Sequence, residues 1–166
     1  ISGIPFTTGI FTNLSRDHLD YHETMEDYFA AKKLLFEQFP LKAAVINIDD
    51  SYGMRLASEV KIPDLITFGW HPSAKARIVS MTAFKRRTEV VLEYCGRIFD
   101  CSVPLLGQFN AENAIASAFA VQREMGLDLA VIFRHLKQLI AAPGRMECFE
   151  SSGLPTCVLD YAHTPD

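Results

Sequence analysis

The sequence is poor in positive charge and in long apolar runs. Sixteen lysines and arginines stand against twenty aspartates and glutamates in 166 residues, so the net charge at pH 7 is −4. Proteins that bind the nucleic acid backbone carry a basic excess, and we therefore expect no nucleic acid partner. Charged residues interrupt every helix-length window, so we also expect no membrane-spanning segment.

Several signature motifs are missing. The four cysteines form no CxxC pair, which argues against zinc-ribbon and thioredoxin chemistry. Neither the phosphate loop GxxxxGK[ST] nor the nucleophile elbow GxSxG occurs. With 49% hydrophobic and 22% charged residues, the composition is that of a globular protein and excludes disorder. A signal-peptide pattern is lacking and a core of this size needs no disulfides, which predicts a cytoplasmic protein with reduced thiols.

Hydrophobic periodicity predicts a mixed α/β fold, with a mostly parallel sheet flanked by helices and a small antiparallel section. Buried strands are expected over 8–13, 43–48 and 65–68. The antiparallel section is expected over 76–83, 88–94 and 97–103. Helices are expected over 24–39, 51–60, 109–125 and from Asp128 to about Ile140. Two short strands, 146–149 and 156–160, end the chain.

A polar run from Asn13 to His22 follows the first expected strand. Loops at the carboxyl ends of strands are where α/β sheets bind ligands. His18 and His22 are four residues apart, so they can share a helix face as metal ligands often do. The alternative is that the aspartates of this run cap a helix while the histidines lie at the surface. The residues alone slightly favour that alternative.

Lys32 lies on the first long helix, after two alanines. Small residues on the preceding turn would let a lysine lie close against a ligand. Spacing alone favours the alternative of a solvent-facing lysine, and it does not distinguish Lys32 from Lys33.

Asn110 and Asn113 are three residues apart, so both amides lie on one side of a helix start that follows Gly107. An amide offers a donor and an acceptor together, which suits a planar base. The alternative, equally favoured by the residues, is that Asn110 simply caps the helix.

Two further candidates come late in the chain. Arg145 follows a Pro-Gly turn, where a guanidinium can meet a phosphate; the alternative is a surface ion pair with Glu147 or with another residue. Asp160 ends the last strand and can hold a ribose or a water, or it can be a turn residue before Pro165.

Read in chain order, these segments resemble the Mur ligases. The matching segments are 12–22, 25–32, 47–50, 107–113, 144–147 and 160–166. Each is weak by itself, whereas the ordered set is specific and covers nearly the whole chain. The stretch from about Ser58 to Cys101 matches only in its expected strands.

The resemblance implies part of the central ATPase domain of an ATP-dependent amide ligase. The most similar enzymes of the family add the third amino acid, meso-diaminopimelate or L-lysine, to UDP-MurNAc-L-Ala-D-Glu through an acyl phosphate. The implied substrates are therefore this UDP-MurNAc-dipeptide, the amino acid and ATP, with Mg²⁺ as cofactor. The implied role is peptidoglycan synthesis, and with it cell wall biogenesis, cell shape and cell division. The parent protein is expected to be a monomer.

The resemblance also assigns metal ligands. His18 matches the family histidine that helps to hold the second magnesium, and Lys32 matches the lysine that becomes carboxylated. An unmodified lysine, with a pKa near ~10.4, is a cation that repels magnesium. Carboxylation turns it into an oxygen-donor anion, which suits a hard metal. The family pattern therefore overturns the solvent-facing alternative for Lys32.

The nucleotide contacts follow in the same way. Asn110 and Asn113 match the family pair beside the adenine, and Arg145 matches the arginine that faces the ATP phosphates. Together with His18 and Lys32, Arg145 is expected to act in catalysis. Asp160 matches the acid that contacts the nucleotide from the next domain. One departure is Glu23, where the family usually has glycine.

We expect residues 1–149 to form the later part of the central domain, and residues 150–166 to form a linker and the first strand of the ligase domain. The family phosphate loop would lie upstream of Ile1, so the fragment alone is expected to be inactive. Two alternatives remain: a folylpolyglutamate synthase-like ligase, which shares the fold and the carboxylated lysine, and a non-catalytic nucleotide-binding module. The sequence leaves open whether diaminopimelate or lysine is added.

Overall fold

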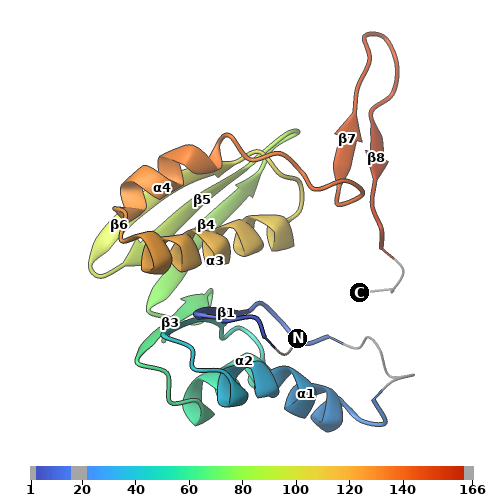
Figure 1. The fold of residues 1–166 in the computed structure, drawn as a ribbon. Coiled ribbons are helices and arrows are strands. Elements are labelled where there is room, and N and C mark those ends of the chain that lie inside the picture. The colour runs from blue at the N-terminus through green and yellow to red at the C-terminus, as the bar shows by residue number, and fades with distance from the viewer. Residues whose placement is uncertain (1–2, 16–21, 163–166) are drawn as a thin grey trace.

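The computed structural model describes residues 3–15 and 22–162. Six strands form one sheet in chain order (Figure 1). They are β1 (Thr8–Phe11), β2 (Ala43–Asn47), β3 (Asp64–Gly69), β4 (Ala76–Ala83), β5 (Thr88–Tyr94) and β6 (Arg97–Val103). Neighbouring strands from β1 to β4 are parallel, whereas β4, β5 and β6 are antiparallel. The expected mixed sheet with a small antiparallel section is confirmed.

Helices cover both faces of this sheet. They are α1 (Met25–Gln38), α2 (Ser51–Glu59), α3 (Gln108–Met125) and α4 (Leu129–Leu136). In Figure 1, α1 and α2 lie on one side of the parallel strands and α3 lies on the other. Strand β2 shows why, because Ala44 and Ile46 belong to the apolar cluster under α1 and α2, while Val45 belongs to the cluster under α3 and α4. A strand buried on both faces is typical of parallel sheets.

Local sequence signals set most helix ends. Side-chain oxygens of Thr24, Asp50 and Asp128 accept backbone N–H groups at the starts of α1, α2 and α4. The expected extension of α4 to about Ile140 is wrong, because the helix ends at Leu136. The two residues after its C-cap, Gln138 and Leu139, donate to carbonyls only three positions back. This tighter turn ends the α-helix well before Pro143.

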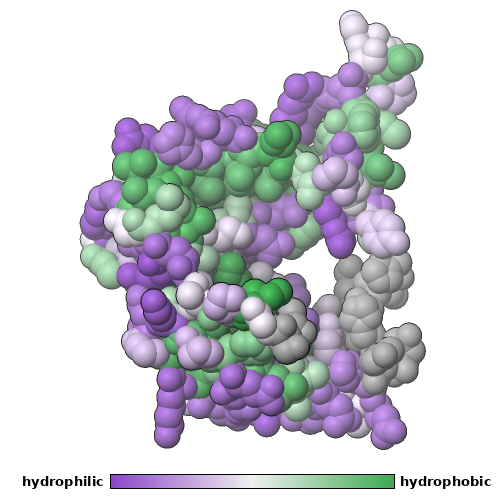
Figure 2. Space-filling model, viewed as in Figure 1, coloured by the Kyte–Doolittle hydropathy of each residue, from purple (hydrophilic) through white to green (hydrophobic). Residues whose placement is uncertain are grey.

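The last two strands stand apart from the sheet. β7 (Glu147–Phe149) and β8 (Cys157–Leu159) pair antiparallel with each other. The expected domain boundary near residues 150–155 falls in the loop between them. Figure 2 shows this hairpin projecting from the body, with an open gap beside its base. Across residues 3–15 and 22–162, no helix has the length and hydropathy of a membrane span.

Candidate active site

Polar side chains gather where β1, β2 and β3 end, the edge of the sheet at which α/β proteins bind ligands. They surround a pocket of about 300 Å³. Its lining residues are Thr12, Asn13, Asn47, Asp49, Asp50, Trp70, Gln108 and Glu112. The start of α3 thus meets the loops that follow three parallel strands.

The two aspartates of this pocket hold its loops together. Asp50 caps α2 and also accepts the backbone N–H of Leu14 at 3.3 Å. Asp49 accepts the backbone N–H groups of Trp70 and the following residue at 2.7 and 2.8 Å. Both carboxylates therefore fix the positions of the chain segments around the pocket.

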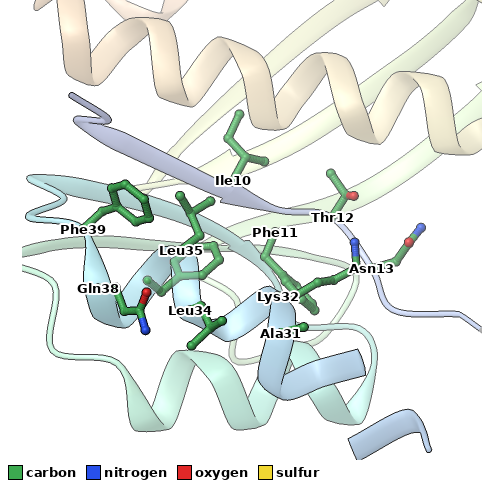
Figure 3. A pocket seen from close by; sticks show the side chains of 11 residues that line it. Ile10, Phe11, Thr12, Asn13, Ala31, Lys32, Leu34, Leu35, Gln38 and Phe39 are labelled. Atoms are coloured by element: carbon green, nitrogen blue, oxygen red, sulfur yellow. The ribbon is translucent and has the colours of Figure 1, made fainter. Parts of the chain in front are cut away.

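A longer groove of about 590 Å³ runs between β1 and α1. Figure 3 shows Lys32 and Asn13 together at one end of it and Phe39 at the other. The Lys32 ammonium lies 4.8 Å from the centroid of the Tyr28 ring. Within the described part of the chain it forms no ion pair. Lys32 is thus a cation at the mouth of an apolar groove, with no charged partner among the described residues.

The neighbouring Lys33 is different. Its ammonium lies 2.6 Å from Glu37 and 2.7 Å from Glu59. Hydrogen bonds to Glu37 and then Glu59 raise the pKa of Lys33 above its ordinary value. The structure thereby separates two lysines that spacing alone could not distinguish, because Lys32 lines the groove and Lys33 faces α2.

The metal site expected at His18 and Lys32 is only partly visible. His18 lies outside the described residues, while His22 stacks on Tyr28 with ring centroids 5.0 Å apart. In residues 3–15 and 22–162, no three His, Cys, Asp or Glu side chains converge to hold a metal. The unmodified Lys32 ammonium does not fit Mg²⁺, whereas its carboxylated form would add the oxygen ligands that this ion takes.

Asn110 and Asn113 line a pocket of about 360 Å³ between α3, α4 and the segment that follows α4. The Asn110 amide nitrogen donates to the Leu106 carbonyl at 2.7 Å, so its amide oxygen stays available as an acceptor. Capping by Asn110 is wrong, because Gly107 is the N-cap, with φ of 87°, and no side chain bonds there. The apolar walls are Leu105, Ala114, Ala118, Val121, Ile132, Leu136, Leu139 and Ile140.

Arg145 lines the same pocket. The alternative of an ion pair with Glu147 is wrong, because Glu147 accepts the Gly144 N–H at 2.9 Å instead. The Arg145 guanidinium forms no ion pair with any described residue and lies 5.9 Å from the Tyr161 ring centroid. Three polar groups expected to contact a nucleotide, Asn110, Asn113 and Arg145, therefore line one apolar pocket.

Asp160 lies beside Arg145 but not in the pocket lining. One carboxylate oxygen accepts the Met146 N–H at 2.7 Å and the other accepts the Ala162 N–H at 2.8 Å. Asp160 thus makes the contacts of a turn residue, and its contact with the nucleotide from the next domain stays a prediction. It also ties the chain end after β8 to the turn that carries Arg145.

The sequence profile of the Mur ligase middle domain matches residues 1–121. The chain belongs to the Mur ligase family. Its match to the middle domain ends within α3, so Arg145 and Asp160 lie beyond the matched residues.

Named Mur ligases match the chain over its length. A protein of Neisseria meningitidis serogroup A, named UDP-N-acetylmuramoyl-L-alanyl-D-glutamate--2,6-diaminopimelate ligase, is 44% identical over 170 residues, covering 100% of this chain and 34% of that protein. The protein of the same name from Aquifex aeolicus is 39% identical, covering 97% and 32%. This chain therefore spans about a third of the curated relatives that it matches.

A solved structure supports the same fold. The structure titled UDP-N-acetylmuramoyl-L-alanyl-D-glutamate--2,6-diaminopimelate ligase superposes with a TM-score of 0.81 at 36% identity, covering 98% of this chain and 34% of that chain. The mixed sheet flanked by helices is thus the architecture of a Mur ligase central domain.

Sequence reasoning missed part of this site. Trp70 and Glu112 were not candidates, yet both line the pocket that contains Asn13. The Trp70 indole N–H donates to Glu112 at 3.1 Å, and Gln108 donates to the same oxygen at 2.9 Å. The sequence did hold one signal for Trp70. It is the only tryptophan of the chain and directly follows the third parallel strand, at the edge where such sheets bind ligands.

Proposed function

We propose that the full-length protein containing this chain is an ATP-dependent ligase that adds diaminopimelate to UDP-MurNAc-L-Ala-D-Glu in peptidoglycan synthesis. The observation that carries the proposal is the 44% identity, over the whole chain, to a relative named for this reaction. Both curated relatives described above are named for the addition of diaminopimelate. Their names favour diaminopimelate over lysine as the added amino acid.

The nucleotide is proposed to bind in the pocket shared by Asn110, Asn113 and Arg145. Its volume of about 360 Å³ and its apolar walls suit a nucleoside. The free amide oxygen of Asn110 can accept from the exocyclic amine of adenine, which is a donor. The Arg145 guanidinium, which has no carboxylate partner among the described residues, is suited to a phosphate. Binding by these groups would hold the triphosphate in a fixed orientation.

Lys32 and His18 are proposed to hold Mg²⁺, with Lys32 carboxylated on its side-chain nitrogen. The ion would neutralise charge on the phosphates. The described residues favour Lys32 over Lys33 for this change, because carboxylation requires a neutral amine. Glu37 and Glu59 stabilise the charged form of Lys33, whereas no carboxylate of the described residues pairs with Lys32.

The proposed reaction follows from these contacts. The substrate carboxylate attacks the γ-phosphate of ATP, which gives an acyl phosphate and ADP. The amine of the incoming amino acid then attacks the acyl carbon, phosphate leaves, and an amide bond is formed. Catalysis of this kind depends mainly on positioning and charge neutralisation.

A folylpolyglutamate synthase-like ligase is the second candidate for the activity, since such enzymes share the fold and the carboxylated lysine that the resemblance implies.

The first experiment is phosphate release from ATP by the full-length protein with Mg²⁺, bicarbonate and UDP-MurNAc-L-Ala-D-Glu. We expect turnover with meso-diaminopimelate and at least about tenfold less with L-lysine, a difference of ~1.4 kcal/mol in transition-state binding. Turnover with folate and glutamate instead, or none with either amine, would overturn the proposal.

A further inference from the structure

The β7–β8 hairpin is held to the body by very few contacts. Among residues 3–15 and 22–162, its strands pair only with each other, and neither apolar cluster of the body includes a residue beyond Leu136. Its large apolar side chains are exposed, for example Phe149 at 51% and Leu159 at 53%. The direction of the hairpin therefore depends on polar contacts.

Those contacts converge on Glu150, the residue after β7. The Lys85 ammonium lies 3.2 Å from one of its carboxylate oxygens, and the Arg86 guanidinium pairs with the other. Both cations come from the loop between β4 and β5. The Thr156 hydroxyl, just before β8, donates to the same carboxylate at 3.1 Å. The Glu150 side chain is only 21% exposed, although its cationic partners are 74% and 70% exposed.

This cluster is mechanically connected to Arg145. β7 begins two residues after Arg145, and Asp160 binds the Met146 N–H, so the hairpin and the Arg145 turn are joined at both strands. Beneath them a cavity of about 560 Å³ separates the hairpin base from the body. Because this space is not filled by packed side chains of the described residues, the ion pairs of Glu150 are the charged contacts, within that part of the chain, that oppose a rotation of the hairpin and of Arg145 with it.

We propose that Lys85 and Arg86 are positioning residues of the ligase. By pairing with Glu150 they hold the hairpin, and thereby keep Arg145 directed at the pocket of Asn110 and Asn113. The nucleotide part of this inference rests on the proposed function, whereas the orientation of the hairpin does not. Exposed ion pairs weaken with salt, so the orientation is expected to loosen at high ionic strength.

The chain supplies a matched control next to these residues. Arg87 pairs with Glu89 and lies 4.6 Å from the Phe84 ring centroid, all within its own hairpin. Arg87→Gln removes one positive charge from the loop that also carries Lys85 and Arg86, and it leaves the contacts of Glu150 in place. A variant at this position therefore reports any effect of net charge alone.

The experiment uses the full-length protein. Spin labels on the exposed Cys95 and Cys157 report the distance between body and hairpin, with Cys148→Ser and other reactive cysteines replaced. In parallel, ADP binding with Mg²⁺, the KM for ATP and kcat are measured for Glu150→Gln, Arg86→Glu and the exchanged pair Arg86→Glu/Glu150→Arg. An exposed ion pair changes an equilibrium by about 1.4- to 5-fold.

We expect Glu150→Gln to broaden the distance distribution and to raise the Kd for ADP and the KM for ATP by roughly 3- to 10-fold, the effect of losing two such pairs. The change in kcat at saturation should stay within about twofold. The exchanged pair should regain part of the affinity that Arg86→Glu loses, because one ion pair returns while Lys85 then faces an arginine. A concentration of 0.5 M KCl should loosen the wild type, while Arg87→Gln remains normal.

Unchanged distances and affinities in Glu150→Gln, or failure of the exchanged pair to recover either, would overturn the positioning role. The proposed function is tested separately, because it would be overturned if the wild type released no phosphate. A hairpin that loosens in Glu150→Gln without any change in ADP affinity would refute the link to Arg145.

Discussion

At the scale of single residues, the decisive contrast is between Lys32 and Lys33. They are adjacent in sequence and identical in type, yet Lys33 is bound to two carboxylates and Lys32 to none that is described. Successive helical residues project about 100° apart, so only one of the two can line the groove beside β1. The chemistry proposed for Lys32 therefore depends on which way α1 is turned.

Lys32→Ala in the full-length protein is expected to lower turnover by about 100-fold or more, the size of effect that follows loss of a charge-stabilising group. Short carboxylic acids added to the assay should restore part of the activity, because they return the missing oxygen ligands. The measurement is phosphate release, with Lys33→Gln as the matched control that should keep turnover. Normal turnover of Lys32→Ala would show that the carboxylation assignment is wrong.

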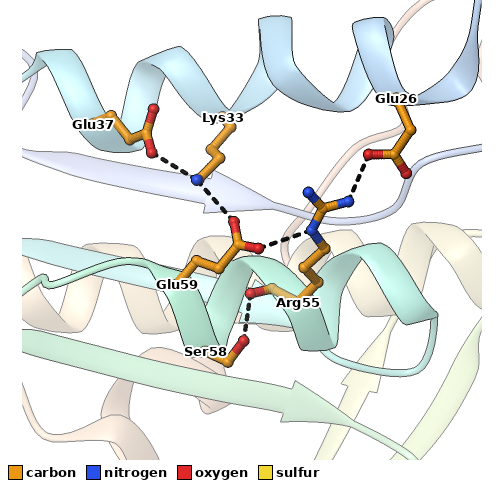
Figure 4. A network of polar contacts seen from close by, with 6 residues as sticks. All are labelled: Glu26, Lys33, Glu37, Arg55, Ser58 and Glu59. Carbon is orange, nitrogen blue, oxygen red and sulfur yellow. Dashed lines mark hydrogen bonds and ion pairs between the residues drawn. The ribbon is translucent and has the colours of Figure 1, made fainter.

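At the scale of elements, α1 and α2 are joined by a chain of alternating charges (Figure 4). Arg55 on α2 pairs with Glu26 at 2.6 Å and Glu59 at 2.8 Å, and Glu59 also pairs with Lys33 on α1. Burial of Phe29 and Phe36 sets the rotation of α1 about its axis, and the network forms at that rotation. Lys33 then faces α2 and Lys32 lies at the groove.

Glu59→Gln should lower the melting temperature at pH 7. The difference in melting temperature from the wild type should shrink as the pH is lowered. Hydrogen bonds from Lys33 and then Arg55 lower the pKa of Glu59 below its ordinary value of 4.5. A lowered pKa means that the charged carboxylate stabilises the fold above pH 4.5, and that this contribution disappears as the pH falls through the lowered value. Melting curves from pH 7 down to pH 3 measure the gap.

The control for this series is Glu23→Gln, which removes the same charge from the chain outside the network. Its melting temperature should follow the wild type at every pH. A gap between Glu59→Gln and wild type that persists unchanged at pH 3 would show that packing, and not the carboxylate charge, causes the loss.

At the scale of the molecule, two apolar clusters on opposite faces of one sheet hold the body together. The hairpin contributes to neither cluster, and among the described residues its ion pairs to the body are those of Glu150. Stability and nucleotide positioning are therefore carried by different parts of the chain. Figure 2 shows the hairpin projecting from the body.

Truncation of the chain after Ala142 should change the free energy of unfolding by less than about 2 kcal/mol, because the ion pairs to the body that the described residues lose are the two of Glu150. Urea unfolding followed by circular dichroism measures this change. Phe119→Ala is the comparison, since this side chain is fully buried and its loss should cost about 3–5 kcal/mol. A truncation as costly as Phe119→Ala would mean that the hairpin belongs to the core.

The sequence alone determined which segments are helices and strands. The apolar run of β2, the caps at Asp50 and Asp128, and the stop at Gly126 each act through neighbours a few residues away, so pattern and capping predicted these elements and ends. The mixed sheet followed from the same periodicities. The end of α4 was the exception, because a short 3₁₀-type turn leaves no clear signal in the hydrophobic pattern.

Only the tertiary structure decided which candidates share a pocket. Arg145 lines one pocket with Asn110 and Asn113, Asp160 accepts the Met146 N–H, and Glu59 pairs with Lys33 and not with Lys32. These contacts join residues far apart in the chain. Such contacts depend on how helices are rotated and where loops end, and these are fixed by packing of the whole molecule. Local periodicity carries no information about that packing, so the sequence could name the polar groups but not their partners.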